Sequence, residues 1–412
     1  MRTPPLTARA AAIERRSPFR IGLGEAAGAV ADLGVMVPLT TALILVNGLD
    51  AGAVLVCAGL LVLGSGLVFR IPFPVQPLKA LTAVAVAQRL APDVIHAAGL
   101  EIAALLVLLS VHHVADVVAR VFTQPVVRAL QLGVGVLLAI TASKLVLDPP
   151  DVFAATPASP WPWMLMLAAF AGIVVAARSR RYWIALAILV SGTAVAVVVA
   201  TPDLSGPSLS IPMIELPPGS AFATAFFLLV VPQLPLTFGN AVVAVDRLAH
   251  EYLGPAASRV SPSRVCLSAG IGNAVSGVLG GIPMCHGAGG LTAHVRLGAR
   301  TAGMNLVLAG AFLALGLFFA PDVPQVLGLL PVWGLAAFLA YAGARHAWLV
   351  TDLRGWDLGL AVAAGALGAW AGNLAVTAAI ALTAVHGRRV LAARIGVGTP
   401  AGSTRRRRTP LP

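Results

Sequence analysis

The chain has 412 residues, of which 58% are hydrophobic and only 11% are charged. A soluble protein of this length needs far more charge to cover its surface, and the mean hydropathy of +0.91 instead indicates burial in lipid. The formal net charge of +12 would suggest nucleic acid in a soluble protein. Here the arginines lie in loops and tails, where the positive-inside bias places them. We therefore expect an all-α polytopic membrane protein without a nucleic-acid partner.

The predicted elements follow a basic lead, residues 1–18, which lacks the apolar core of a signal peptide and is expected to be cytoplasmic. A membrane span needs roughly 20 mostly apolar residues. Fourteen apolar segments come next, at residues 21–46, 51–69, 78–89, 95–119, 124–147, 161–177, 182–200, 220–246, 263–281, 288–298, 303–320, 325–344, 356–370 and 372–386. A basic tail, residues 388–412, follows them and is also expected to be cytoplasmic.

Two of these segments, 78–89 and 288–298, are too short to cross a hydrocarbon core of about 30 Å at about 1.5 Å per residue. Counting both as crossings places the arginine-bearing loops inside and leaves outside loops 148–160, 201–219 and 321–324 without Lys or Arg. Omitting either segment would invert the later loops against the positive-inside rule. We therefore expect both termini on the cytoplasmic side of a bacterial inner membrane, since the Ala, Gly and Arg usage is typical of a GC-rich bacterial genome.

The two halves of the chain repeat the same short patterns in the same order. The run from Val37 to Thr40, Val-Pro-Leu-Thr, matches the Leu-Pro-Leu-Thr run from Leu234 to Thr237. An Ile-Pro pair followed by Leu-Thr-Ala occurs at Ile71 and again at Ile282. With seven segments in each half, the second repeat (207–387) must be inverted relative to the first (19–206). Inverted repeats of this kind are typical of alternating-access transporters.

Helix breakers precede each short segment, including Pro72, Pro74 and Pro77 in the first half and Pro283 and Gly287 in the second. Proline suits an extended stretch and the first turn of a helix. We therefore expect the chain to run extended to mid-membrane before each short segment and to begin a half-helix there. A helix start presents free N–H groups and about half a positive charge. Two opposed starts therefore predict an anion site near the membrane centre.

The candidate substrate residues lie at these starts and in the two flanking Pro-Leu-Thr helices. They are Gln76, Lys79, Thr40, Gln233, Asn240, Cys285, His286, Gly287, Ala288 and Gly289. Lys79 would add a full positive charge, with snorkelling to a surface as the alternative, and the glycines would let the backbone approach the anion. A structural role stays open for His286, and satisfaction of a helix break is the alternative for the three flanking polar residues.

Three carboxylates in or near spans, Glu25, Asp32 and Asp246, are candidate carriers of a coupling proton or cation. A helix-end salt bridge is the alternative for Asp246, because Arg247 is adjacent. The three cysteines have no paired spacing, and no His or Cys cluster has ligand spacing. We therefore expect no disulfide framework, no metal and no cofactor.

Two stretches, Phe73 to Ala80 and Gly281 to Gly303, resemble the signatures of the molybdate-transporter branch of the sulfate permease superfamily. The segments from Glu25 to Pro38 and from Pro232 to Asn240 are also similar to that branch, and the resemblance covers residues 20 to about 385. It implies a fourteen-segment, seven-plus-seven inverted fold with core and gate domains. Sulfate permeases typically carry a STAS domain after the membrane region, whereas only the basic tail follows here, which favours the molybdate branch.

The sequence thus predicts a secondary active transporter of a tetrahedral oxyanion, molybdate or sulfate or both, driven by a coupling proton or cation. Its other partner is the lipid bilayer, and a homodimer is left open. The first alternative is a permease for uracil or xanthine, which has a similar fold but binds an uncharged ring; Lys79 argues against it. The second is an intramembrane enzyme, which would need an acid/base or metal constellation that no motif supplies. We therefore expect a transporter and not an enzyme.

Overall fold

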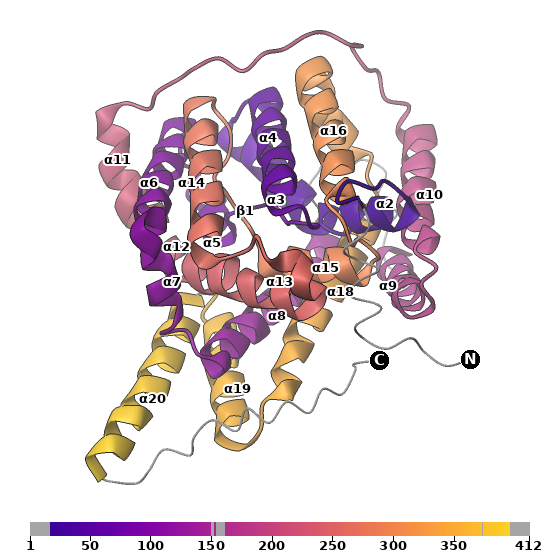
Figure 1. Ribbon diagram of the computed structural model, residues 1–412. Helices are drawn as coiled ribbons and strands as arrows, with labels where there is room; N and C mark the ends of the chain where they lie inside the picture. The colour runs from indigo at the N-terminus through magenta and orange to yellow at the C-terminus, as the bar shows by residue number, and fades with distance from the viewer. Residues whose placement is uncertain (1–16, 150–151, 154–160, 373, 396–412) are drawn as a thin grey trace.

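The computed structural model describes residues 17–149, 152–153, 161–372 and 374–395, which fold almost entirely into helices (Figure 1). In chain order the helices are α2 (Leu23–Val30), α3 (Leu33–Asn47), α4 (Ala51–Phe69), α5 (Lys79–Ala87), α6 (Pro92–Ser110), α7 (Val114–Ala119), α8 (Gln124–Leu147), α9 (Trp161–Ser179), α10 (Trp183–Ala200), α11 (Gly219–Ala225), α12 (Val231–Leu236), α13 (Val245–Leu253), α14 (Pro262–Val278), α15 (Ala288–Arg296), α16 (Gly303–Phe318), α17 (Val323–Gly328), α18 (Val332–Ala347), α19 (Gly355–Trp370) and α20 (Leu374–Ile395). Two short strands, β1 (Gln76–Pro77) and β2 (Met284–Cys285), complete the described structure.

Each predicted apolar segment contains helix, and the bounds of α4 and α8 agree with the prediction to the residue. Of the basic lead and tail, residues 1–16 and 396–412 lie outside the described residues, as does most of loop 148–160. The tail predicted from residue 388 stays a prediction; its first residues are helical, because α20 continues to Ile395 and includes Arg388, Arg389 and Arg394. An apolar window could not reveal this, since arginine is itself a good helix former.

Seven helices in the described part of the chain are long and apolar enough to cross a membrane, or up to nine when each of two bent pairs is taken as one span. Helices α14, α16, α18 and α19 have only 16 or 17 residues, slightly below the length that a full crossing requires. The two nine-residue helices, α5 and α15, are far shorter. The count of fourteen crossings therefore stays a prediction.

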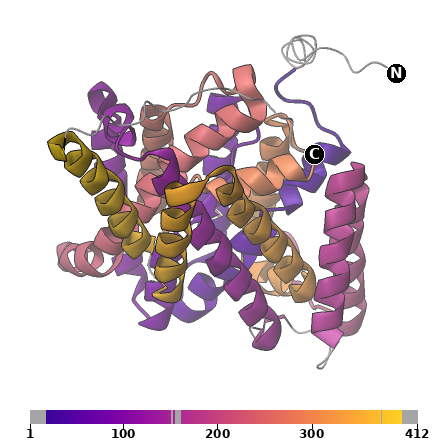
Figure 2. The same cartoon turned by 90° about the horizontal axis from the view of Figure 1, so that it is seen from below.

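The two halves of the chain interleave and do not form separate bodies. Helix α14 packs against α6 and α4, and α16 packs against α4 and α2, so second-half helices lie between first-half helices (Figure 1). A second packing group surrounds α8, which contacts α18, α19 and α20, while α9 contacts α10 and α18 (Figure 2). The α15 and α3 helices both contact α18 and so join the two groups.

Two long helical stretches are interrupted where the sequence places proline or a polar residue. The axis bends by 42° between α2 and α3, and Asp32 stands at the bend as the N-cap residue of α3. From Gly219 to Leu253 the chain is helical throughout, but Phe226–Val230 (η2) and Thr237–Ala244 (η3) are π-helical. Pro232 and Pro235 lie between these two stretches, where a missing N–H and a bulky ring favour a locally widened helix.

The extended leads before α5 and α15 meet as an antiparallel pair, in which Gln76 lies opposite Cys285 and Pro77 opposite Met284. Beyond the pair, the Leu78 N–H donates to the Pro283 carbonyl at 3.0 Å. Backbone outside a helix must find partners when it is buried away from water. Each lead therefore supplies hydrogen-bond partners for the backbone of the other.

Two buried asparagines satisfy the rest of this backbone. Asn305 of α16 accepts from the Phe73 N–H at 3.0 Å and donates to the Phe73 carbonyl at 2.7 Å. Asn273 of α14 does the same for Met284, at 2.7 Å and 2.8 Å. A carboxamide matches a peptide group in carrying one donor and one acceptor side by side. Each lead is therefore held by a long helix through one side chain.

We expect Asn273→Leu and Asn305→Leu each to destabilise the protein by about 2–4 kcal/mol, because each leaves a buried N–H and carbonyl without partners. Thermal unfolding of the purified protein in detergent measures the effect. Thr141→Val serves as the control, since the Thr141 hydroxyl is exposed and bonds only to the Leu137 carbonyl of its own helix. Melting temperatures of the leucine variants equal to that of the control would show that the leads do not depend on the asparagines.

Candidate functional site

The starts of α5 and α15 lie on either side of the strand pair, so two helix N-termini from opposite halves of the chain come together. Helix α5 begins at Lys79, directly after β1, and α15 begins at Ala288, shortly after β2. Among the described residues, the N–H groups of Ala80, Ala288 and Gly289 have no hydrogen-bond partner. Unpaired N–H groups at helix starts are the elements of an anion-binding site.

Lys79 turns inward and joins the two starts. Its Nζ donates to Gln76 Oε1 at 2.6 Å. The same atom lies 3.5 Å from the point that a Cβ on Gly287 would occupy, so the ammonium of α5 stands directly beside the beginning of α15. The side chain is half-buried. The ammonium therefore bonds inside the protein beside the start of α15, and the substrate role of Lys79 stays a prediction.

Gln76 lies across the beginning of α15 and is 1% exposed. Its carboxamide accepts from Lys79 and donates to Asp32 Oδ1, so it connects a cation to a carboxylate. Gly287 and Gly290 accommodate it: a Cβ on Gly290 would come within 2.7 Å of Gln76 Nε2 and within 3.0 Å of Asp32 Oδ1. A Cβ on Gly289 would meet only Leu138, at 3.6 Å. Gly287, which is expected to admit an anion, therefore also makes room for Gln76, as does Gly290, whereas Gly289 does not.

His286 is fully buried and both ring nitrogens have protein partners. Nδ1 lies 2.9 Å from the Pro74 carbonyl and Nε2 lies 3.1 Å from the Ser268 hydroxyl. Because a carbonyl only accepts, Nδ1 carries the proton. The ring also packs edge-on against Phe73, with centroids 4.8 Å apart. This geometry favours the structural alternative for His286, which ties the second half's lead to the first. Its neighbour Cys285 is buried in β2.

The flanking polar residues differ in their surroundings. Thr40 bonds back to the Met36 carbonyl of its own helix, beside Pro38. Gln233 accepts from the Leu81 N–H of α5 at 3.0 Å and donates to Thr237 at 2.9 Å, so it caps the first half-helix. Asn240, in the π-helical stretch, is 3% exposed, and its Oδ1 has no partner among the described residues. Of the three, only Asn240 has an unpartnered atom, and that oxygen accepts hydrogen bonds, so only the Nδ2 group of Asn240 could donate to an anion.

The three candidate coupling carboxylates lie in different places. Glu25 accepts from the N–H groups of Arg300 and Thr301, at 3.0 Å and 3.1 Å, and so fixes the turn between α15 and α16. Asp246 lies 3.5 Å from His250, one turn later on the same face of α13. Asp32 is the carboxylate that reaches the site, through Gln76, and its Oδ2 lies 3.5 Å from His294 Nε2.

Several polar residues of this region were not predicted from the sequence: His294, Thr292, His346, Asn273 and Asn305. All five are fully buried. The available signal was a polar residue in the middle of an apolar helix, the same signal that drew attention to Thr40 and Gln233. Only the fold reveals which of them face the strand pair.

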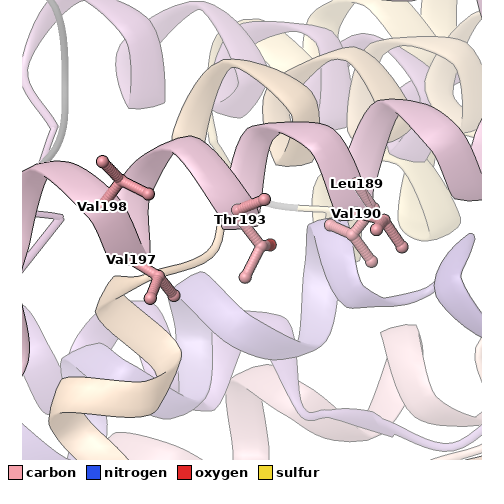
Figure 3. A pocket seen from close by; sticks show the side chains of 6 residues that line it. Leu189, Val190, Thr193, Val197 and Val198 are labelled. Atoms are coloured by element: carbon pink, nitrogen blue, oxygen red, sulfur yellow. The ribbon is translucent and has the colours of Figure 1, made fainter.

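The described surface also contains an open apolar groove of about 540 Å³ along α10, lined by residues such as Leu189, Thr193 and Val197 (Figure 3). A groove with one hydroxyl and no charge suits lipid chains and offers nothing to an oxyanion. Within the described residues, no group of three His, Cys, Asp or Glu side chains could hold a metal ion.

The model of one protein family, described as the molybdate transporter of the MFS superfamily, matches residues 24–138 and 225–345. Each matched stretch contains one of the half-helices. Molybdate transporter 2 of Arabidopsis thaliana is 31% identical over 373 residues, covering 80% of this chain and 79% of that protein. Molybdate transporter 1 of Chlamydomonas reinhardtii is 29% identical, with 80% and 84% covered.

The chain belongs to the molybdate transporter family. The resemblance predicted from the two signature stretches is thereby confirmed, and the protein is a membrane transporter and not an enzyme. Among solved structures, the transmembrane domain of the cyanobacterial bicarbonate transporter BicA has a TM-score of 0.58 at 17% identity, covering 88% of this chain and 96% of that one. SLC26A9 has a TM-score of 0.55 at 15% identity, with 90% and 65% covered. This molybdate transporter family member therefore has the fold of those two proteins.

We expect Gly290→Ala to destabilise the transporter by about 1–3 kcal/mol, because the added methyl would collide with Gln76, Pro74 and Asp32 together. The matched control is Gly289→Ala, one residue away in the same helical turn, where the methyl would make only an ordinary contact. Melting temperatures of the two variants in detergent test the difference. Equal values would show that Gln76 does not lie across the start of α15.

Proposed function

We propose that this protein is a secondary active transporter of a tetrahedral oxyanion, molybdate or sulfate or both, across the bacterial inner membrane. The observation that carries the proposal is the meeting of Lys79 with the two half-helix starts: its Nζ lies 3.5 Å from the Cβ position of Gly287. The anion would be held by the free N–H groups of Ala80, Ala288 and Gly289, by the Lys79 ammonium and by the Nδ2 group of Asn240 as a further donor. The molybdate transporters among its relatives support the choice of substrate.

The charge at this point favours a dianion over an uncharged ring. Each helix start contributes about half a positive charge and Lys79 a full one, while backbone N–H groups suit oxyanion oxygens without any further ligand. A nucleobase would instead need acceptors and donors placed in the plane of a ring. Molybdate and sulfate are both tetrahedral dianions, so a site built from N–H groups and one ammonium would accept both.

We further propose that the chain forms two inverted repeats of seven segments, with a core domain that carries the site and a gate domain around α8. Support comes from the antiparallel pairing of β1 with β2, since segments related by a two-fold axis in the membrane plane run in opposite directions where they meet. The two helix packing groups support the division into core and gate. Movement of one group against the other would open the site to each side in turn.

Lys79→Ala should weaken molybdate binding about a hundredfold, since a partly desolvated charge beside a dianion contributes a few kcal/mol. Lys144→Ala is the control, because Lys144 is exposed in the last turn of α8. The dissociation constants for molybdate are measured on the purified variants. Uptake of labelled molybdate into proteoliposomes is measured in competition with sulfate and with uracil. Equal constants for the two variants would remove Lys79 from the site, and competition by uracil but not by sulfate would favour the nucleobase permease.

The proposed topology places loop 201–219 in the periplasm and the turn after α9 in the cytoplasm, with both termini cytoplasmic. A cysteine at Ser208 should therefore react with an impermeant thiol reagent in intact spheroplasts, whereas a cysteine at Ser179 should react only after lysis. Both positions are exposed, and the three native cysteines are buried and should give little background. Labelling of the Ser179 variant in intact spheroplasts would invert the topology.

A further inference from the structure

Two buried side chains in this region, Asp32 and His294, face each other through atoms that have no hydrogen-bond partner among the described residues. His294 Nδ1 lies 2.7 Å from the Gly28 carbonyl, which only accepts, so Nδ1 carries a hydrogen. In neutral His294, Nε2 is then an acceptor, and it faces Asp32 Oδ2 at 3.5 Å. Neither Nε2 nor Oδ2 has a hydrogen-bond partner among the described residues. Two buried acceptors that face each other are costly until one proton is placed between them.

Among the described residues, no other side chain makes a hydrogen bond to Asp32 Oδ2 or His294 Nε2. The elements that carry the pair or pack against them bear the following charged and titratable groups: Lys79 on α5, Cys285 on β2, Glu25 on α2, Arg296 and the adjoining Arg300 on and after α15, Asp246, Arg247, His250, Glu251 and Tyr252 on α13, Arg128 and Lys144 on α8, and Arg345 and His346 on α18. Glu25 binds backbone N–H groups, Arg296 lies over the Tyr252 ring, and Arg128 binds Asp352. Helices α10 and α16, which also pack against α2, carry no titratable side chain.

The pair also lies next to the place proposed for the anion. Asp32 Oδ1 lies 3.0 Å from the Cβ position of Gly290, in the first turn of α15. It is joined to Lys79 by a chain of two hydrogen bonds through the Gln76 carboxamide. A carboxylate and a dianion at the same helix start repel each other, so occupancy by the anion favours the protonated form of the pair.

We propose that Asp32 and His294 form a proton site whose occupancy is coupled to that of the oxyanion, so that the transporter carries at least one proton with each anion. The inference rests on the proposed anion site and adds its driving ion. The proton enters from the aqueous phase and lies between Asp32 Oδ2 and His294 Nε2. Protonation removes one negative charge from the site, and by linkage each ligand increases the affinity for the other. Gln76 couples the two events, because it contacts both Asp32 and the lysine that would hold the anion.

The test is molybdate binding to the purified full chain measured as a function of pH, from about pH 5 to about pH 8. Calorimetry in buffers of different ionisation enthalpy reports the protons taken up with each anion. For the wild type we expect uptake of one proton, and an affinity that falls up to about tenfold per pH unit on the alkaline side, the limit for a single linked proton.

Asp32→Asn gives the sharpest variant, because its amide can donate permanently to His294 Nε2 and still accept from Gln76. We expect it to bind molybdate with an affinity independent of pH, to exchange labelled molybdate across proteoliposomes, and to lose accumulation driven by a proton gradient. Glu101→Gln is the matched control, a carboxylate of α6, which packs against α14, and it should keep the wild-type pH dependence. If Asp32→Asn fails to fold, His294→Gln replaces it and should also abolish linked proton uptake.

The outcomes separate the two proposals. A wild type that binds neither molybdate nor sulfate would overturn the proposed function itself. Tight binding without proton uptake would leave the anion site in place and overturn the proton site. An Asp32→Asn variant whose molybdate binding keeps the wild-type pH dependence would also overturn the proton site. So would molybdate accumulation driven by a sodium gradient, if the wild type and this variant both show it.

Discussion

The structure depends on one constraint: extended backbone inside a membrane must find all its hydrogen bonds in the protein. The leads before α5 and α15 meet this constraint by pairing with each other, with Gln76 opposite Cys285, and by binding the carboxamides of Asn305 and Asn273. Because the pairing is antiparallel, the two helices that follow leave it in opposite directions. Both helix starts, with their unpaired N–H groups, are thereby fixed at one place.

Charge at that place is balanced through a short chain of side chains. Lys79 donates to Gln76, Gln76 donates to Asp32, and Asp32 faces His294. In the proposed mechanism the anion would replace Gln76 Oε1 as the acceptor of the Lys79 hydrogen bond. The proton would neutralise the Asp32 carboxylate, which the anion repels. The bend of 42° between α2 and α3 makes this arrangement accessible, because it places Asp32 at a helix end where its side chain can reach α15.

The likeness to solved structures indicates that one fold can serve transporters of different anions. BicA is a bicarbonate transporter, and its transmembrane domain has a TM-score of 0.58 with this chain at 17% identity. At that identity the likeness extends to the fold alone. The side chains that would distinguish one anion from another, among them Lys79 and Asn240, belong to this chain's own sequence.

The sequence by itself determined the class, the family and the approximate positions of the helices, because hydropathy, proline spacing and the signature stretches are local properties. It also identified Lys79, Gln76 and Asp32, but as separate polar residues without partners. It did not distinguish polar residues with partners inside the protein from those without: His286, Gln233 and Thr40 have partners, whereas Asn240 Oδ1 has none among the described residues. His294 and Asp32 are 262 positions apart in the chain. Only the tertiary structure shows that two unpartnered atoms of these side chains face each other. Such a contact depends on distance and orientation in space, which no local pattern in the sequence records.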